Sequence, residues 1–317
     1  MESSEIKESI DRIRENIAKI IVGLDEIVDL MLIAMFSGGH ILLEGPPGLG
    51  KTTLAKTFAN TIGGTFKRVQ MIPDLLPSDV LGINIFNPYD STWMIRKGPI
   101  FSNIILIDEL NRASPKVQSA FLQVMQEKEV TIENETLPVD DPFLVIATQL
   151  PVGGLGTYPL TAVQIDRFAY IIYLDNPTLE TEQQILGRLD IIDTSNVESV
   201  ITLDKVLSII AKSREVYVDE AIVKYITHIV HDFRQNEYIR SGPSPRASIW
   251  IYRGSRVLAM MRGREFVTPD DVKTLVKYVV PHRLEFTSEA RMQEIHLSDL
   301  ITQTLDRVPV PKGIEQD

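Results

Sequence analysis

A glycine-rich segment early in the chain, residues 45–53, has the composition of a phosphate-binding loop. It fits the pattern G-x-x-x-x-G-K-[ST] and lies between an apolar run and an amphipathic run. Glycines let several backbone N–H groups turn toward phosphate oxygens, and a following helix adds its positive dipole end. The residues predicted to surround the phosphates are Gly45, Pro46, Pro47, Gly48, Leu49, Gly50, Lys51, Thr52 and Thr53.

Two of these residues have side chains that suit a bound nucleoside triphosphate. Lys51 is expected to reach the β- and γ-phosphates, and Thr52 is expected to give Mg²⁺ a hydroxyl ligand. The alternative is a glycine-rich turn that matches the pattern by chance. The flanking strand and helix patterns favour the phosphate-binding loop, so ATP and Mg²⁺ are the predicted cofactors.

A second segment, "NIILIDELNRA" at residues 103–113, places two carboxylates after an apolar run. Ligands of open α/β sheets bind at the carboxyl ends of the strands, where Asp108 is expected. We predict that Asp108 holds Mg²⁺ and that Glu109 is the general base for an attacking water. An ordinary acidic turn is the alternative, and the phosphate-binding loop disfavours it. Because residue 109 is a carboxylate, hydrolysis is predicted and not binding alone.

The elements that would position these residues are five short apolar strands separated by helical patterns. Such continuous apolar runs are typical of strands covered on both faces. Strand and helix in repetition predict a parallel five-stranded sheet between two helical layers, an αβα core. The strands are expected at residues 40–44, 66–71, 103–108, 143–148 and 170–174.

The strand signal fades after residue 175, where we expect the core, residues 1–175, to end. A small all-helical lid domain is predicted for residues 176–309 because apolar residues recur there at helical spacing. Ser244 and Thr268 are expected to cap two of its helices, each followed by a proline in the first turn. Residues 310–317 are expected to form a loose C-terminal tail.

Composition and charge favour a protein partner over a nucleic acid. The 317 residues carry a formal net charge of −11 without a basic run, whereas nucleic-acid binders place Lys and Arg against phosphates. The chain has no cysteine, which excludes disulfides, thiolate zinc sites and a cysteine nucleophile. No signal peptide is visible, and the apolar run at residues 27–36 is too short to span a bilayer. A cytoplasmic protein without membrane insertion is expected.

Four segments in the same order resemble the MoxR branch of the AAA+ ATPases. They are the phosphate-binding loop, "LIDELNRASPKVQSAFLQVMQE", "GTYPLTAVQIDRF" and "GPSPRA". The resemblance covers nearly the whole chain. It implies an αβα ATPase core, a helical lid, and nucleotide sites at the subunit boundaries of a ring, usually a hexamer.

Within this resemblance two arginines are similar to residues that contact the γ-phosphate. Arg167, in "DRF", resembles an arginine finger that acts in trans on the neighbouring subunit. Arg246 resembles the sensor-2 arginine and is expected to contact the γ-phosphate in cis. The alternatives are a salt bridge at a helix end for Arg167 and a surface arginine for Arg246.

The chain departs from the family pattern at the end of the fourth strand. Where the family usually has Ala-Thr-Gln-Asn-Pro, this chain has Leu150 in place of the sensor-1 Asn. Leucine cannot hydrogen-bond a water or phosphate, so Gln149 or Thr148 is expected to substitute, and slow turnover is predicted if neither does. Val22 and Gly23 lie in the region where such folds receive the adenine base.

Two hairpins are predicted as insertions in the core, at residues 79–101 and 128–141. The resemblance implies a helix-2 insert and a pre-sensor-1 hairpin, which in such rings face the pore or a partner. Their turns carry acidic and polar residues, whereas a DNA-gripping hairpin presents Lys or Arg. Stiffening of the loops is the alternative role.

Several other residues are weaker candidates. His228 and His231 share a helical face without a third ligand, so no metal site is predicted. Trp93 and Trp250 are expected to be core or interface anchors, and Tyr89 is a candidate for partner contact.

The favoured function is a Mg²⁺-dependent ATPase that remodels or matures protein complexes in a chaperone-like manner. The resemblance implies self-association into a ring, a protein client and a partner with a von Willebrand factor A domain. A nucleic-acid motor is the first alternative because related helicases share both hairpins. A nucleotide-gated scaffold with weak turnover is the second, supported by Leu150.

Overall fold

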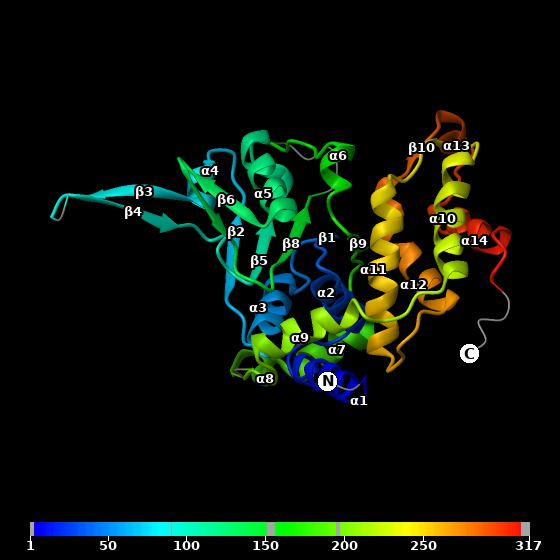
Figure 1. Ribbon diagram of the computed structural model, residues 1–317, viewed down its shortest axis with the longest axis horizontal. Helices are drawn as coiled ribbons and strands as arrows, with labels where there is room; N and C mark the ends of the chain where they lie inside the picture. The colour runs from blue at the N-terminus through cyan, green and yellow to red at the C-terminus, as the bar shows by residue number, and fades with distance from the viewer. Residues whose placement is uncertain (1–2, 90, 151–155, 195–196, 312–317) are drawn as a thin grey trace.

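The computed structural model describes residues 3–89, 91–150, 156–194 and 197–311 and contains the parallel five-stranded sheet that the sequence predicts (Figure 1). Its strand order is β2-β5-β8-β1-β9, and every neighbouring pair is parallel. All five predicted strands are present and differ from the prediction by at most one residue at either end. The bounds are β1 (Ile41–Glu44), β2 (Phe66–Gln70), β5 (Ile104–Asp108), β8 (Leu144–Gln149) and β9 (Tyr170–Tyr173).

The alternation of side chains along the strands divides the core into two apolar layers. In β5, Ile104 and Leu106 join one buried cluster, while Ile105 and Ile107 join the other. Both faces need covering, so helices pack on each side. The first layer contains α1 (Ser3–Ala18), α2 (Asp25–Ser37) and α3 (Lys51–Thr61); the second contains α4 (Pro77–Leu81), η1 (Leu110–Arg112) and α5 (Pro115–Glu127).

Helices dominate the chain after β9, as predicted, with one short two-stranded ribbon in addition. The predicted caps form: the Ser244 hydroxyl accepts the N–H of Arg246, and Asp271 accepts the N–H of Thr268. The elements from α6 onward, β9 excepted, are α6 (Ala162–Ile165), α7 (Leu179–Gly187), α8 (Leu189–Thr194), α9 (Leu203–Ser213), α10 (Glu220–Gln235), β10 (Ile239–Ser241), α11 (Pro245–Met261), α12 (Pro269–Val279), η2 (Pro281–Arg283), β11 (Glu285–Phe286), α13 (Ser288–Met292) and α14 (Leu297–Arg307).

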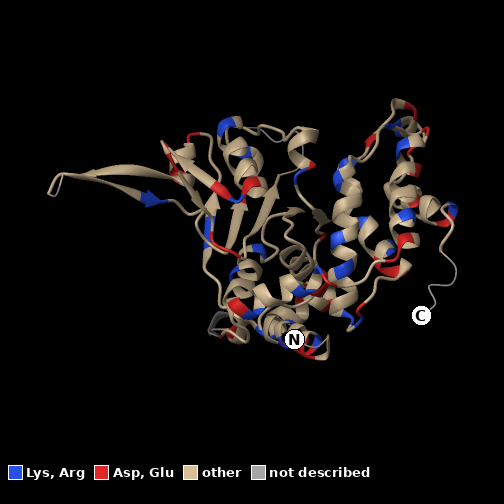
Figure 2. Ribbon diagram, in the orientation of Figure 1, with Lys and Arg blue, Asp and Glu red and all other residues tan. Residues whose placement is uncertain are grey.

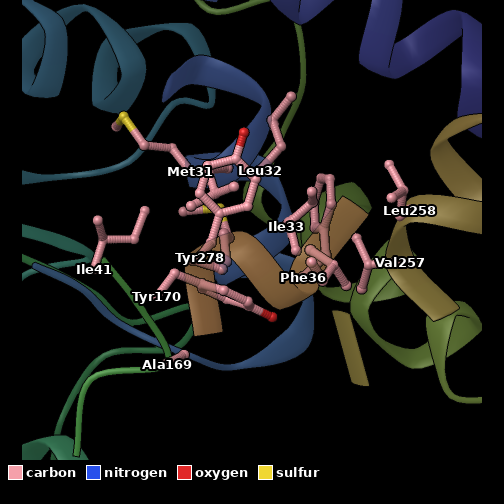
Figure 3. Close-up of a cluster of buried hydrophobic side chains, with 14 of the residues drawn as sticks. Met31, Leu32, Ile33, Phe36, Ile41, Ala169, Tyr170, Val257, Leu258 and Tyr278 are labelled. Atoms are coloured by element: carbon pink, nitrogen blue, oxygen red, sulfur yellow. The ribbon is translucent and has the colours of Figure 1, made fainter. Parts of the chain in front are cut away.

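The lid is joined to the core by a continuous apolar cluster and not only by the chain connection. Figure 3 shows Phe36 of α2 and Tyr170 of β9 near Val257 and Leu258 of α11 and Tyr278 of α12. The hydroxyl of Tyr170 also donates to the carbonyl of Trp250 at 3.4 Å. This packing fixes the side of the core on which the lid lies.

Both predicted hairpins are present. The arm formed by β3 (Gly82–Asn87) and β4 (Thr92–Lys97) extends away from the body, and β6 (Glu129–Ile132) pairs with β7 (Glu135–Pro138) beside it (Figure 1). Among the described residues, no helix is long and apolar enough to cross a membrane.

Candidate nucleotide-binding site

The loop between β1 and α3 has the backbone shape that its glycines permit. Gly48 and Gly50 have φ values of +86° and +70°, in the left-handed region that favours glycine. Gly45 passes so close to β9 that a Cβ atom there would lie 2.6 Å from the carbonyl oxygen of Leu174. The loop therefore curls at the carboxyl end of β1, with the first turn of α3 behind it.

Lys51 and Thr52, at the start of α3, both line a cavity of about 210 Å³ at the carboxyl ends of the strands. The Lys51 ammonium donates to the carbonyl of Gly45 at 2.9 Å. Burial lowers the pKa of Lys51 from its ordinary value, and the charges of Asp108 and Glu109 oppose this shift. Lys51 is thus a cation beside a glycine loop, held by an acceptor that a phosphate oxygen can replace.

Asp108 ends β5 inside the same cavity and forms an ion pair with Arg68 of β2, with Nε and Oδ2 2.6 Å apart. The Asp108 side chain is 12% exposed and that of Arg68 is 49% exposed. The described residues contain no group of three His, Cys, Asp or Glu side chains that could hold a metal by themselves. A hydroxyl and one carboxylate nevertheless fit Mg²⁺, which commonly binds through one or two protein ligands and substrate phosphates.

Glu109 adopts the left-handed conformation, with φ of +58°, which a non-glycine residue rarely does. Two contacts hold it there. Its N–H donates to the hydroxyl of Thr148 at 2.8 Å, and its carboxylate pairs with Arg112 at 3.2 Å. The carboxylate is 28% exposed, so water can reach it. Strain maintained by neighbouring contacts is typical of functional sites.

The end of β8 forms the third wall of the cavity. Gln149 donates from Nε2 to the carboxylate of Glu44 at 2.8 Å, and Leu150 also lines the cavity. The side chain of Asn111 pairs with the backbone of Leu150 in both directions, at 2.9 and 3.0 Å. Asn111 therefore fixes the backbone of residue 150 whatever side chain it carries. Pro151, which follows, lies outside the described residues.

A larger cavity of about 570 Å³ adjoins the glycine loop and has the apolar lining that an adenine ring requires. Val22 and Gly23, which the sequence analysis places in the region of the adenine base, border it together with Thr53 and the loop residues 47–50. Its apolar lining consists mainly of Ile20, Ile21, Leu24, Ile27, Leu174, Ile185 and Ile192. The phosphate cavity and this apolar cavity share the glycine loop, which is the arrangement expected for a nucleotide.

A separate polar cluster surrounds Asp166 at the opposite end of the sheet. Its carboxylate accepts from Ser244 at 2.9 Å, from Arg246 at 3.0 Å and from Nε of Arg283 at 2.8 Å. Ala169 donates its N–H to the carbonyl of His40, so the segment lies at the amino ends of β9 and β1. All three donors to Asp166 come from the lid, whereas Asp166 belongs to the core.

Arg283 is the central residue of this cluster. Its guanidinium is 1% exposed and also donates to the carbonyls of Asp166, Phe168, Ala169 and Val279. Burial lowers the pKa of Arg283 to about 10, and Asp166 opposes that shift. Arg167 lies in the turn that Arg283 encloses, and its own Nε is buried without a hydrogen-bond partner among the described residues.

This position changes the interpretation of Arg246. The sequence led us to expect a contact in cis with the γ-phosphate, but Arg246 pairs with Asp166 at the amino end of β9. The glycine loop follows the carboxyl end of β1, and neither Arg167 nor Arg246 lines either cavity. The cis arrangement is therefore not the one observed, because lid packing on α2 and β9 brings the start of α11 to the other end of the sheet.

Sequence reasoning missed several residues of the site. Arg68, Arg112 and Asn111 hold Asp108, Glu109 and residue 150, and Glu44 holds Gln149. The only signal for Arg68 was its place on the strand that pairs with β5. Trp93, expected as a core or interface anchor, is 64% exposed on the β3–β4 arm, so it is not a core residue. Trp250 is half-buried and packs against the apolar cluster.

Comparisons with known proteins agree with this geometry. The model of the AAA family, "ATPase family associated with various cellular activities", matches residues 40–170, and the model of the AAA lid domain matches residues 231–304. The chain is 39% identical to the uncharacterized protein YeaC of Bacillus subtilis, over 94% of this chain and 93% of that protein. It is 38% identical to the chaperone MoxR1 of Mycobacterium tuberculosis, over 96% and 83% respectively. A crystal structure of a candidate ATPase from Cytophaga hutchinsonii superposes with a TM-score of 0.92 at 38% identity, covering 98% of this chain and 97% of that one.

Proposed function

The chain belongs to the MoxR family of AAA+ ATPases, and from this premise we propose that it hydrolyses ATP to ADP and phosphate in order to remodel protein complexes. One observation carries the proposal: Lys51, Thr52, Asp108 and Glu109 converge on a single cavity beside the glycine loop. A cation, a hydroxyl and two carboxylates in that arrangement suit phosphoryl transfer to water.

Binding of the triphosphate would use groups that are already close to their working positions. The loop N–H groups and Lys51 would hold the phosphates, while the apolar cavity next to Val22 and Gly23 would take the base. Thr52 and Asp108 would hold Mg²⁺, which supplies neutralisation of the β- and γ-phosphate charge. Arg68 is half-exposed and has Gln70 as a second acceptor at 3.1 Å, so it can release Asp108.

Glu109 would accept the proton of the attacking water. The contact between its N–H and Thr148 links the base to β8, so the position of Glu109 depends on the strand that also carries Gln149. Arg112, three residues away, pairs with the carboxylate at 3.2 Å. A general base must lie within hydrogen-bond reach of its water, and these contacts restrict where Glu109 can point.

Arg167 and Arg246 would act on the next subunit. They lie together at the amino end of β9, away from the nucleotide cavities of their own chain. In the proposed ring of head-to-tail contacts, that end of one subunit would face the carboxyl end of its neighbour. Guanidinium groups supplied in this way neutralise charge that grows in the transition state. We therefore include a ring, a hexamer by family resemblance, in the proposal.

The client would be a protein. The β3–β4 arm carries exposed apolar side chains, and the rings of Phe86 and Trp93 lie 5.3 Å apart on one of its faces. Figure 2 shows no Lys or Arg on the described residues of the outer part of the arm, which does not suit a phosphate backbone. The exposed apolar residues of the arm are Ile83, Phe86, Tyr89, Trp93 and Met94.

From the family resemblance we also propose a cytoplasmic location and a partner with a von Willebrand factor A domain. A pull-down with the hydrolysis-blocked Glu109→Gln protein tests the partner, because a trapped complex should retain it.

The experiment that tests the function is an ATPase assay with Mg²⁺ on the wild-type chain and on Glu109→Gln. We expect turnover to fall about 10²- to 10⁴-fold in the variant, with nucleotide affinity retained. The matched control is Glu289→Gln, which changes an exposed glutamate of α13. Equal turnover in Glu109→Gln would remove Glu109 as the base, and no turnover in the wild type would leave the scaffold alternative.

The same assay distinguishes the proposed protein-remodelling ATPase from a nucleic-acid motor. Addition of single-stranded or duplex DNA, or of RNA, should leave turnover unchanged if the client is a protein. Strong stimulation by any of them would favour the motor.

A further inference from the structure

The outward face of α7 is exposed although it borders the nucleotide cavity. None of the residues of α7 is buried. Ile185 faces inward and lines the apolar cavity, whereas Leu179 and Leu186, seven residues apart and so on one face, are 67% and 66% exposed. Glu180, next to Leu179, is exposed as well, whereas Glu182 lines the apolar cavity together with Ile185. Two large apolar side chains on one exposed helical face, with an acidic residue beside them, suit contact with another molecule.

A cavity of about 690 Å³ at the amino ends of the strands has the complementary character. It lies between the end of α2, the segment before β8, and helices α9 and α11. Its apolar lining includes Phe36, Phe143, Leu207, Ile210 and Tyr252, and its cations are Lys128, Arg214, Arg253 and Arg256.

The charge of this cavity is largely uncompensated. Among the residues that the structure describes, Asp141 is the one carboxylate that lines the cavity, and it already pairs with Lys128 at 2.9 Å. Within the described ranges, no carboxylate pairs with Arg214 or Arg253, and Arg256 donates to backbone carbonyls. In a chain with a net charge of −11, a cationic cavity with an apolar floor suits an acidic and apolar partner surface.

Helix α11 connects this cavity to the Asp166 cluster. Arg246, Ile249 and Arg253 fall on one helical face because their spacings are three, four and seven residues. Ile249 is 46% exposed, and the guanidinium of Arg253 stacks on Trp250 at 5.4 Å. Figure 2 shows basic residues along this helix. We call the face formed by Arg246, Ile249 and Arg253 the α11 stripe.

The two surfaces lie at opposite ends of the strands, and a head-to-tail contact joins two different surfaces of one chain. α7 follows the carboxyl end of β9, and the cationic cavity includes Gly38 and Phe143, which precede β1 and β8. Along α11, seven residues span about 10 Å. If Arg246 faces the phosphates of the neighbour, Arg253 lies about 10 Å from that contact along α11.

We propose that the outward face of α7 docks, in the next subunit of the ring, against the α11 stripe and the cationic cavity. The occupant is a second copy of this chain. Leu179 and Leu186 pack on Ile249 and the apolar floor, while Glu180 faces Arg253. This inference rests on the proposed function, from which it takes the ring.

The contact gives the ring a route between neighbouring sites. Thr181 and Ile185 of α7 line the nucleotide cavity on the inner side of the same helix. A neighbour that holds the outer side therefore fixes the position of the cavity wall. Nucleotide affinity in one subunit then depends on the presence of the next.

Cysteine cross-linking tests the contact directly because the chain has no cysteine of its own. A Leu186→Cys chain is mixed with an Ile249→Cys chain, with ATP and Mg²⁺, and treated with a short bismaleimide. We expect a cross-linked dimer of the two chains at a yield at least tenfold above that of Leu186→Cys mixed with Met292→Cys. Met292 is the matched control because it is 84% exposed on α13. Equal yields in the two mixtures overturn the proposal.

Charge reversal gives an independent measure of assembly by sedimentation velocity. Glu180→Arg and Arg253→Glu should each weaken subunit association at least tenfold, because like charges then face each other. The double variant restores opposite charges at every contact and should recover most of the loss. Arg291→Glu, an exposed lid position outside the stripe, should assemble as the wild type does. Failure of the double variant to recover, with both single variants folded, overturns the pairing.

ATPase turnover is recorded on the wild type in parallel. If the wild type hydrolyses ATP but the selective cross-link does not form, the docking inference is overturned and the proposed function stands. A selective cross-link without turnover supports the contact and contradicts the function. A chain that remains monomeric with nucleotide overturns the docking inference.

Discussion

The two ends of the parallel sheet treat their charged residues differently. At the carboxyl ends, Lys51, Asp108 and Glu109 each have a partner that is partly exposed or is a single backbone carbonyl. At the amino end of β9, Asp166 and Arg283 are largely withdrawn from water, and the Asp166 carboxylate accepts from three lid residues.

This difference separates a site for a ligand from a structural joint. A cavity that must accept phosphates keeps contacts that a ligand can replace at small cost. A buried guanidinium with several acceptors has no comparable substitute, since removal of its carboxylate leaves an uncompensated charge. The carboxyl end should therefore respond to mutation in binding and turnover, and the amino end chiefly in stability, with the proposed action of Arg167 and Arg246 on the next subunit as the exception.

Arg167→Ala is the strongest test of that exception. If Arg167 acts in trans, turnover should fall about 10³-fold or more while nucleotide binding stays nearly intact. Turnover and nucleotide affinity are measured separately on the same preparation. Mixing Arg167→Ala with Lys51→Ala should restore part of the activity, because the two defects fall on opposite sides of one interface. No rescue in mixed rings would indicate a site completed within one chain.

Lys51→Ala should have the next largest effect, and it should appear in binding. Removing the cation that faces the phosphates is expected to weaken nucleotide affinity roughly 10²-fold or more. Titration with a fluorescent ATP analogue measures this. Thermal stability should change little because, within the described residues, the Lys51 side chain makes one hydrogen bond, to the Gly45 carbonyl. Undiminished affinity would refute the assignment of the loop.

The sequence predicts the residues at the carboxyl ends of the sheet strands far better than those at the amino ends. The glycine loop and the 103–113 segment are short local patterns, and the five strands follow from apolar runs. The pairs Asp166–Arg283, 117 residues apart, and Asn111–Leu150, 39 residues apart, exist only once the chain has folded. The direction of Arg246 could not be predicted either, because it depends on how α11 packs against α2 and β9.

Asp166→Asn tests whether the Asp166 cluster at the amino end of β9 is a structural joint between the core and the lid. The buried guanidinium of Arg283 would lose its carboxylate, so we expect the free energy of unfolding to fall by about 3 kcal/mol. Urea denaturation measures it. The double variant Asp166→Asn, Arg283→Met is the control, because it also removes the buried charge and should be less destabilised than the single variant. Equal stability of Asp166→Asn and wild type would mean that the joint carries little energy.

His40, which precedes β1 at the amino end of the sheet, is expected to make the stability of the fold depend on pH. It lies fully buried before β1, where Nε2 bonds the carbonyl of Met125 and Nδ1 accepts the N–H of Val145, each at 3.0 Å. Burial lowers its pKa to about 4; the Met125 bond opposes this shift, and the charge of Lys128 adds to it.

Between the ordinary pKa of 6.5 and about 4 the unfolded chain binds a proton that the folded chain does not. Stability from His40 is therefore complete above about pH 6.5 and falls by up to about 3 kcal/mol as the pH drops to about 4. Urea unfolding of wild type and His40→Gln from pH 7 to pH 4 isolates this contribution, since other groups titrate in both proteins. Parallel pH profiles would show that His40 is not the source.

Leu150→Asn probes the carboxyl end with the smallest expected effect. Asn111 holds the backbone of residue 150, so an asparagine there would enter the cavity from a fixed position without refolding the strand. One added hydrogen bond near the γ-phosphate is worth about 1 kcal/mol, so turnover should rise roughly fivefold. Leu150→Ala is the control, since it removes the leucine without adding a donor. Equal turnover of Leu150→Asn and Leu150→Ala, together with slow turnover of Gln149→Ala, would mean that Gln149 performs the sensing role. Leu150 is then tolerated because Gln149, held by Glu44, already supplies the contact near the γ-phosphate.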